Sequence, residues 1–326
     1  MSAEITFAQG STLAMDEALA ADESVFILGE DVADNEGGGV VKVTAGLSTS
    51  YGVHRVRSTP ISEQAIVGAA IGAALAGMRP VAEIMLANFL TVAMDQIVNH
   101  AAKIRYMSGG QTAVPLTIRT MSGAGMGSGG QHSDMLEAWF AHVPGLKVVT
   151  GSSPAEVKGL LLSCIFDDDP CIFIECMPTY WNTGPAPEPG LRIPLGKANV
   201  VRRGDDLTAI SYGRPIAQLL DLAERLESEG ISIEVVDLRT ISPLDRQTLL
   251  DSVGKTRRAV VVHEAVEQFG VGAMVSAIIA EELHGNLLSP VVRVASRNCP
   301  VPYSRPLETA YLYSDERIES AIRKVL

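Results

Sequence analysis

Short apolar runs alternate along this chain with segments in which apolar residues recur every three or four positions. The runs have the length of buried strands, and the periodic segments have the pattern of helices. Such alternation is typical of parallel sheets covered by helices, so we expect an α/β fold. Strands are predicted at 25–28, 114–119, 146–150, 171–175, 206–212, 233–238, 259–263 and 291–295, and helices at 11–21, 61–78, 89–103, 154–165, 216–226 and 271–283.

Two local signals refine this pattern. Ser153, Pro154 and Glu156 have capping-box spacing with proline at the first helical position, which marks the start of the helix 154–165. Five of the ten residues at 121–130 are glycine, so this segment is predicted to be a long loop. Long loops inside compact domains are commonly functional, and this one continues into His132.

A run of turn-forming residues separates two blocks of alternating elements. The stretch 182–194 contains four prolines and reads NTGPAPEPGLRIP, which is typical of a linker. The length of 326 residues agrees with about two domains. We therefore predict two parallel-sheet α/β domains at 1–185 and 199–326, joined by a linker at 186–198.

Charge and hydropathy exclude several classes of protein. The net charge is −12, from 26 basic and 38 acidic residues, and no basic cluster exceeds a pair, which argues against a nucleic-acid partner. The longest apolar stretches, 64–78 and 84–94, are shorter than the about 20 residues of a membrane span. No targeting pattern precedes them, so we expect a soluble, cytoplasmic protein. The four cysteines lack CxxC spacing and are expected to be reduced, mostly buried thiols.

Three apparent motifs carry little weight. Gly125, Gly127 and Gly130 match a dinucleotide-binding pattern, but no acidic residue follows about 20 positions later, so we reject this interpretation. His132, Ser133 and Asp134 are adjacent in sequence and cannot converge as a triad. The sequence from His263 to Glu267 resembles a zinc-protease helix without its second histidine, so we expect no metal site there.

Glu63 and His132 are the candidates for catalysis, and the residues alone leave both open. Glu63 lies between a proline turn and a long apolar helix, where it could simply stabilise the helix dipole. It could equally be a carboxyl at the mouth of an apolar site with a raised pKa. His132 has no apolar periodic surroundings, but a loop histidine bonded to backbone is as good an explanation as catalysis.

Several longer stretches resemble the β subunits of thiamine-diphosphate-dependent 2-oxo acid dehydrogenases, which are transketolase-like proteins. They read GEDVA at 29–33, RVRSTPISEQAIVGAAIGAALAG at 55–77, MDQIVNHAAKIRYMSGG at 94–110, QHSDMLEAWFAHVPGLKVV at 131–149 and EVVDLRTISPLD at 234–245. The resemblance covers nearly the whole chain in the same order. It implies a transketolase-like pyrimidine-binding domain followed by a transketolase C-terminal domain. Within this family the chain most resembles acetoin dehydrogenase β subunits, on the residues around Met85, Phe89 and 119–125.

The resemblance assigns roles to individual residues. Glu63 matches the carboxylate that hydrogen-bonds N1′ of the cofactor's aminopyrimidine, which is acid–base work done through the cofactor. Ile61 and Phe89 match positions that line the pyrimidine pocket, and Met85 matches a position facing the reacting centre. His132 matches a loop histidine that serves acyl transfer to a lipoyl arm.

Metals and partners are also implied by the resemblance. Family β subunits bind a structural potassium ion, and the matching positions here are Leu116, Thr117, Cys164, Asp167 and Asp169. The diphosphate of the cofactor and its Mg²⁺ belong to an α subunit, so we expect an α2β2 heterotetramer that serves a lipoyl-bearing acyltransferase. The apolar helices 64–78 and 89–103 are then expected to be buried against partner subunits.

Two departures from the family pattern leave the substrate open. Asp134 stands where the family usually has Gln, and Asn88 replaces a common Asp. The alternatives are a branched-chain or pyruvate dehydrogenase β subunit, and a structural or regulatory subunit that retains the fold without activity.

Overall fold

The chain divides into two compact units in a computed structural model that describes residues 4–326. The first unit contains the residues up to Ser122 and Trp139–Leu195, and the second contains Gly123–Ala138 and Gly196–Leu326. Each unit is built on a mostly parallel sheet, which confirms the predicted α/β class. The glycine-rich loop lies within 1–185 in sequence but packs in the second unit. Residues 1–3 of the predicted first domain lie outside the described residues.

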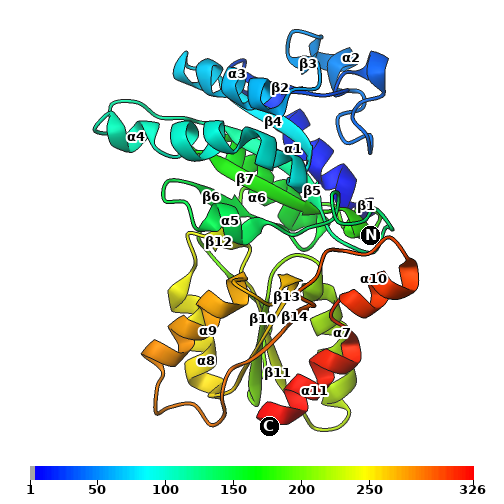
Figure 1. Ribbon diagram of the computed structural model, residues 1–326, viewed down its shortest axis with the longest axis vertical. Helices are drawn as coiled ribbons and strands as arrows, with labels where there is room; N and C mark the ends of the chain where they lie inside the picture. Colours follow the sequence, from blue (N-terminus) through cyan, green and yellow to red (C-terminus); the bar gives the residue numbers. More distant parts are fainter. Residues whose placement is uncertain (1–3) are drawn as a thin grey trace. The chain divides into compact units, whose positions relative to one another are not determined.

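The sheet of the first unit has parallel strands (Figure 1). In spatial order these strands are β6 (Lys147–Val149), β7 (Cys171–Cys176), β5 (Thr117–Ser122), β4 (Arg79–Leu86), β2 (Val25–Gly29) and β3 (Val56–Ser58). The strand predicted at 114–119 corresponds to β5, which begins three residues later, at Thr117. A separate antiparallel pair joins β1 (Glu4–Thr6) to β8 (Thr183–Pro185), so the start of the proline-rich stretch is ordered as a strand.

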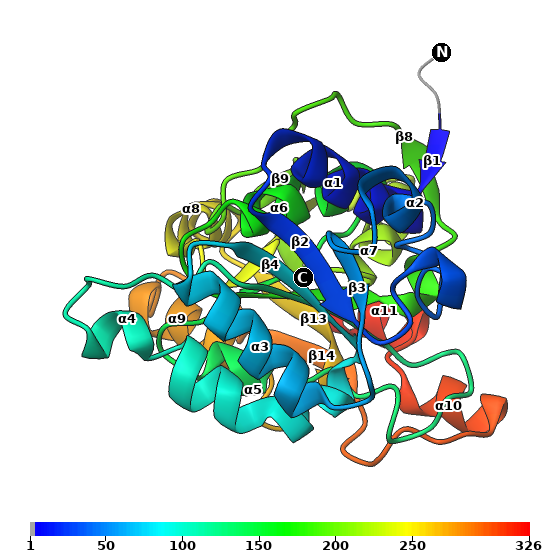
Figure 2. The same cartoon turned by 90° about the horizontal axis from the view of Figure 1, so that it is seen from above.

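Helices cover both faces of this sheet (Figure 2). On one face α1 (Phe7–Ala21) packs against α6 (Pro154–Ile165), and on the other α3 (Glu63–Leu75) lies against β4. The two helices α1 and α6 approach so closely that a Cβ on Gly10 would lie 2.5 Å from the carbonyl oxygen of Pro154. The start of α6 was predicted correctly, because the Ser153 hydroxyl accepts the amide of Glu156.

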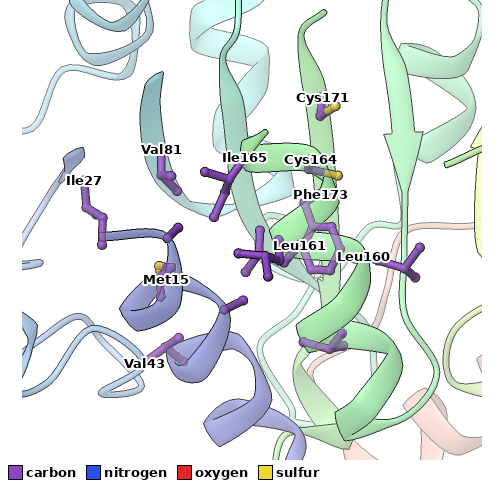
Figure 3. Close-up of a cluster of buried hydrophobic side chains, with 14 of the residues drawn as sticks. Met15, Ile27, Val43, Val81, Leu160, Leu161, Cys164, Ile165, Cys171 and Phe173 are labelled. Carbon is purple, nitrogen blue, oxygen red and sulfur yellow. The ribbon is translucent and has the colours of Figure 1, made fainter. Parts of the chain in front are cut away.

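The core of the first unit forms where these helices meet the sheet. Figure 3 shows side chains from α1, β2, β4, α6 and β7 that interdigitate: Met15, Ile27, Val81, Leu160, Leu161, Cys164, Ile165 and Phe173. Burial of such side chains provides the main favourable free energy of folding.

The predicted helix 89–103 is not a single α-helix. The chain winds as a 3₁₀ segment η2 (Ala87–Ala93), then as a π segment η3 (Gln96–Ala101), before the short helix α4 (Ile104–Met107). The buried face expected from the spacing is nevertheless present, with Leu90, Ile97 and Ala101 buried. The prediction of one uniform helix was wrong because apolar spacing does not distinguish neighbouring helical periods over a few turns.

The second unit has its own five-stranded sheet, with α8 and α9 on one face and α7 and α11 on the other (Figure 1). Its spatial order is β14 (Val292–Ser296), β13 (Ala259–Val266), β10 (Leu207–Ser211), β11 (Ile233–Asp237) and the antiparallel edge strand β9 (Asn199–Arg202). The helices are α7 (Pro215–Glu227), α8 (Arg246–Thr256), α9 (Val271–Glu282), α10 (Arg305–Tyr311) and α11 (Asp315–Val325).

The sequence pattern missed β9, α8, α10 and α11, the short strand β12 (Thr240–Ser242) and, in the first unit, strands β3 and β4. For α11 the signal was present, since Ile318, Ala321, Ile322 and Val325 form its buried face. The remaining short elements are η1 (Asp34–Glu36), α2 (Leu47–Tyr51), α5 (Glu137–Ala141) and η4 (Met177–Thr179).

Two expectations about composition can be compared with the structure. Cys164, Cys171 and Cys176 are buried and Cys299 is exposed, all as free thiols, which agrees with mostly buried reduced cysteines. Within residues 4–326, no helix combines the length and the apolar character that crossing a bilayer requires.

Candidate functional site

The first candidate site lies at the carboxyl edge of the sheet in the first unit. Strand β2 is the parallel neighbour of both β3 and β4, and Gly29 is in register with Ser58 and with Glu83. The carboxyl ends of these strands therefore meet at one edge, the usual place for ligands in parallel α/β sheets. Ile61 and Glu63 follow β3, while Met85 lies near the end of β4 and Phe89 follows it. The structure thus brings these four predicted site residues to one edge.

Glu63 is the first residue of α3 and is half-buried. Its N-cap residue, Ser62, makes no side-chain hydrogen bond to the helix, so Glu63 is the charged group available to the positive helix terminus. Glu30, which follows β2, lies close enough to Glu63 for the charge of Glu63 to affect its pKa. Burial raises the pKa of Glu30, and the negative charges of Asp31 and Glu63 raise it further. Sequence reasoning did not single out Glu30, although its place after a buried strand was a usable signal.

The apolar members of this edge suit an aromatic ligand. Ile61 is 74% exposed, whereas Met85 and Phe89 are partly buried and pack on the core of the first unit. A carboxyl and three apolar side chains at one sheet edge suit an aminopyrimidine, which has apolar ring faces and one basic ring nitrogen. The residues present therefore fit the pyrimidine half of thiamine diphosphate.

A buried ionic network joins the central strands β4, β5 and β7 of the same sheet. Arg119 is 1% exposed, and its guanidinium binds the carboxylates of both Glu83 and Glu175. The Tyr180 hydroxyl donates to Glu175 at 2.5 Å, and the Ser11 hydroxyl also donates to this carboxylate. Sequence reasoning missed the network, although the charged residues within the apolar strands PVAEIML, TIRTM and CIFIEC pointed to it.

His132, the second predicted catalytic residue, belongs to the second unit, whereas Glu63 belongs to the first. It is half-buried in the glycine-rich loop, and its backbone amide donates to the carbonyl of Gly129 at 3.2 Å. His263 has a different environment. Burial, with a smaller contribution from the charge of Arg293, lowers the pKa of His263 to about 4, so this side chain is neutral at physiological pH.

The predicted potassium ligands also lie together, in the first unit. Leu116 and Thr117 precede and begin β5, and Cys164, Asp167 and Asp169 lie at and after the end of α6. The buried Thr117 hydroxyl has no hydrogen-bond partner within the described part of the chain. The ammonium of Lys147 lies 2.6 Å from Asp167 and 3.5 Å from Asp169. The guanidinium of Arg105 also lies 2.5 Å from Asp169, so protein cations already neutralise both carboxylates in the described chain.

A metal site built from side chains would need a group of His, Cys, Asp or Glu residues. Among residues 4–326, no three His, Cys, Asp or Glu side chains are grouped so that they could hold a metal ion.

Comparison with known proteins matches each half of the chain to a described domain. Residues 3–180 match the transketolase pyrimidine-binding domain, and residues 196–318 match the transketolase C-terminal domain. Among solved structures, a split-gene transketolase described as an inactive β4 tetramer aligns with a TM-score of 0.79 over 99% of this chain and 98% of that one. Its sequence identity is 22%, so this likeness concerns the fold alone.

Curated relatives are similar over nearly their full length. The acetoin:2,6-dichlorophenolindophenol oxidoreductase β subunit of Cupriavidus necator is 46% identical, covering 96% of this chain and 95% of the relative. The 2-oxoisovalerate dehydrogenase β subunit of Bacillus subtilis is 41% identical, covering 98% of each. The mitochondrial pyruvate dehydrogenase E1 subunit beta-2 of rice is 42% identical, covering 94% of this chain and 82% of the relative. The chain belongs to the family of dehydrogenase E1 β subunits that join a transketolase pyrimidine-binding domain to a transketolase C-terminal domain.

Proposed function

We propose that this chain is the β subunit of a thiamine-diphosphate-dependent acetoin dehydrogenase. The complex would cleave a C–C bond next to a carbonyl and pass the acyl group to lipoamide. The observation that carries this proposal is that Ile61 and Glu63 follow β3, while Met85 and Phe89 lie at and after the end of β4, its neighbour but one in the same parallel sheet. The 46% identity to an acetoin-oxidising relative favours acetoin as substrate.

Each site residue has a distinct task in this proposal. Bound thiamine diphosphate supplies the carbon nucleophile for the reaction. Glu63 holds a proton at N1′ of the pyrimidine, as a general acid acting through the ring. Ile61 and Phe89 exclude water from the ring faces, and Met85 lies toward the reacting centre. His132 gives a proton to the lipoyl dithiolane when the acyl group is transferred.

The remaining parts of the proposal concern partners and ions. An α subunit holds the cofactor's diphosphate and Mg²⁺, so the working form is an α2β2 heterotetramer in the cytoplasm. A lipoyl-bearing acyltransferase accepts the acyl group. A potassium ion would be held by main-chain oxygens and an Asp side chain at the positions Leu116, Thr117, Cys164, Asp167 and Asp169.

Substitution of Glu63 tests the catalytic assignment. In a complex reconstituted with the α subunit, thiamine diphosphate and Mg²⁺, Glu63→Gln is expected to lower kcat for acetoin oxidation by about 100-fold or more, because a positioned acid contributes about 10²–10⁴-fold. The assay follows reduction of 2,6-dichlorophenolindophenol. Glu23→Gln, at an exposed position before β2, is the matched control and should leave kcat unchanged. An E63Q complex with wild-type kcat would contradict the assignment.

Substrate choice is tested on the wild-type complex. We expect kcat/KM for acetoin to exceed that for 2-oxoisovalerate and pyruvate. Faster turnover of either 2-oxo acid would place the chain with the branched-chain or pyruvate enzymes. Absence of turnover with all three substrates, while the complex still binds thiamine diphosphate, would favour a structural or regulatory subunit.

A further inference from the structure

The glycine-rich loop that carries His132 is held at its start by two buried carboxylates of the second unit. Glu264, on β13, accepts the backbone amide of Ala124 at 2.7 Å. Glu308, on α10, accepts the amides of Gly125 at 2.6 Å and Gly127 at 3.0 Å. These glutamates are only 3% and 2% exposed. Hydrogen bonds from backbone amides to an ionised carboxylate are among the stronger ones in proteins.

The loop is also fixed at its far end. The Tyr212 hydroxyl donates to the carboxylate of Glu137 at 2.6 Å, five residues after His132. At the start of the loop, Arg214, which precedes α7, adds a further bond: it donates to the carbonyl of Ala124 at 2.8 Å and lies 3.9 Å from Glu264. His132 is therefore in a segment with both ends attached to the second unit.

Packing leaves the loop little freedom at these attachment points. Ala124 is buried in a small cluster with Val301 and Tyr311. Gly125 and Gly127 have φ values of 115° and 72°, which favour glycine. At Gly129, φ is 74° and a Cβ would overlap the ring of Tyr303, so a larger residue there would be strained and would displace that ring.

We propose that Glu264 and Glu308 are positioning residues that hold the loop, and through it His132, in the geometry needed for acyl transfer to a lipoyl arm. This inference rests on the role of His132 in the proposed function. Burying two carboxylates is costly unless they are hydrogen-bonded, and loop amides supply those bonds. Loss of the Glu308 carboxylate leaves the amides of Gly125 and Gly127 without this acceptor, so the loop should open more often.

The experiment uses the reconstituted α2β2 complex with Glu308→Ala, and Glu308→Gln as the milder variant. Hydrogen exchange followed by mass spectrometry should show faster exchange confined to peptides from 123–138. The ratio of lipoyl-domain acylation rate to 2,6-dichlorophenolindophenol reduction rate should fall about tenfold in Glu308→Ala, equivalent to about 1.4 kcal/mol. Glu308→Gln keeps one acceptor oxygen and should give an intermediate ratio. If Glu308→Ala does not fold, Glu308→Gln carries the test alone.

Glu234→Gln is the matched control. Glu234 is a buried glutamate of the same unit whose described hydrogen bonds and ion pair go to Gly204, Ser252 and Lys255, all outside the loop. It should leave both the loop exchange and the rate ratio unchanged, even if stability falls. Unchanged hydrogen exchange in Glu308→Ala would show that Glu308 does not hold the loop. Faster exchange with an unchanged rate ratio would show that holding the loop does not matter for acyl transfer.

Failure of the proposed function has a different signature. It would appear in the wild-type complex as absent lipoyl acylation with slow exchange of the loop. In that case the carboxylates still hold the loop, and their role in acyl transfer is overturned.

Discussion

At the scale of single residues, the buried network of Arg119 combines two carboxylates with one guanidinium. Burial and the nearby charge of Glu175 raise the pKa of Glu83, although Arg119 acts in the opposite direction. The folded chain therefore keeps a proton on Glu83 at pH values where the unfolded chain, with an ordinary pKa of 4.5, has released it. Stability from this group is complete below pH 4.5 and is lost as the pH rises through the raised value.

Glu83→Gln should therefore flatten the pH dependence of stability. The variant cannot lose the proton, so its stability relative to wild type should increase as the pH rises from about 4.5. Urea unfolding at a series of pH values measures this difference. Arg119→Met is the contrasting variant, because it leaves Glu83 and Glu175 without their cation and should cost about 3–5 kcal/mol. A pH-independent difference between Glu83→Gln and wild type would contradict the assigned proton.

At the scale of elements, short sequence signals predicted those helices and strands whose ends are set by neighbouring residues. The helix α6 was predicted with its observed bounds because Ser153 and Pro154 fix its start independently of the rest of the fold. The segment after β4 was not, since apolar spacing gives the same buried face for 3₁₀, α and π winding over a few turns, although η2 and η3 both pack against α3. Edge strand β9 was missed for a similar reason, because its residues are only partly buried and show no alternation.

The contact of α1 with α6 gives a prediction at this scale. Gly10→Ala should destabilise the chain by about 1–3 kcal/mol, because the new methyl group would meet the Pro154 carbonyl and force the two helices apart. Gly254→Ala, inside α8, is the matched control, with its nearest neighbour 3.9 Å away, and should stabilise by about 0.5–1 kcal/mol through helix propensity. Thermal unfolding of both variants checks the opposite signs, and equal effects would show that the approach of α1 to α6 is looser than described.

At the scale of the whole molecule, long-range contacts limited what the sequence could predict about the site. Glu63 and His132 were identified by resemblance, since their immediate neighbours allowed a structural explanation for both. The carboxylates that hold the His132 loop, Glu264 and Glu308, lie more than 100 residues further along the chain. No spacing rule connects them to the loop before the fold is known.

Exposed apolar side chains give the last prediction, which concerns assembly. Tyr106, on α4 of the first unit, is 90% exposed, and Met107 beside it is 66% exposed. Side chains of this size are commonly buried in subunit interfaces. If the proposed heterotetramer covers α4, Tyr106→Glu places an unpaired charge in that interface and should shift the complex towards free subunits, with loss of activity at low protein concentration. Sedimentation velocity measures the shift. Gln247→Glu adds the same charge on the exposed side of α8 and should leave assembly intact. A Tyr106→Glu complex that sediments like wild type at nanomolar concentration would show that α4 lies outside the interface.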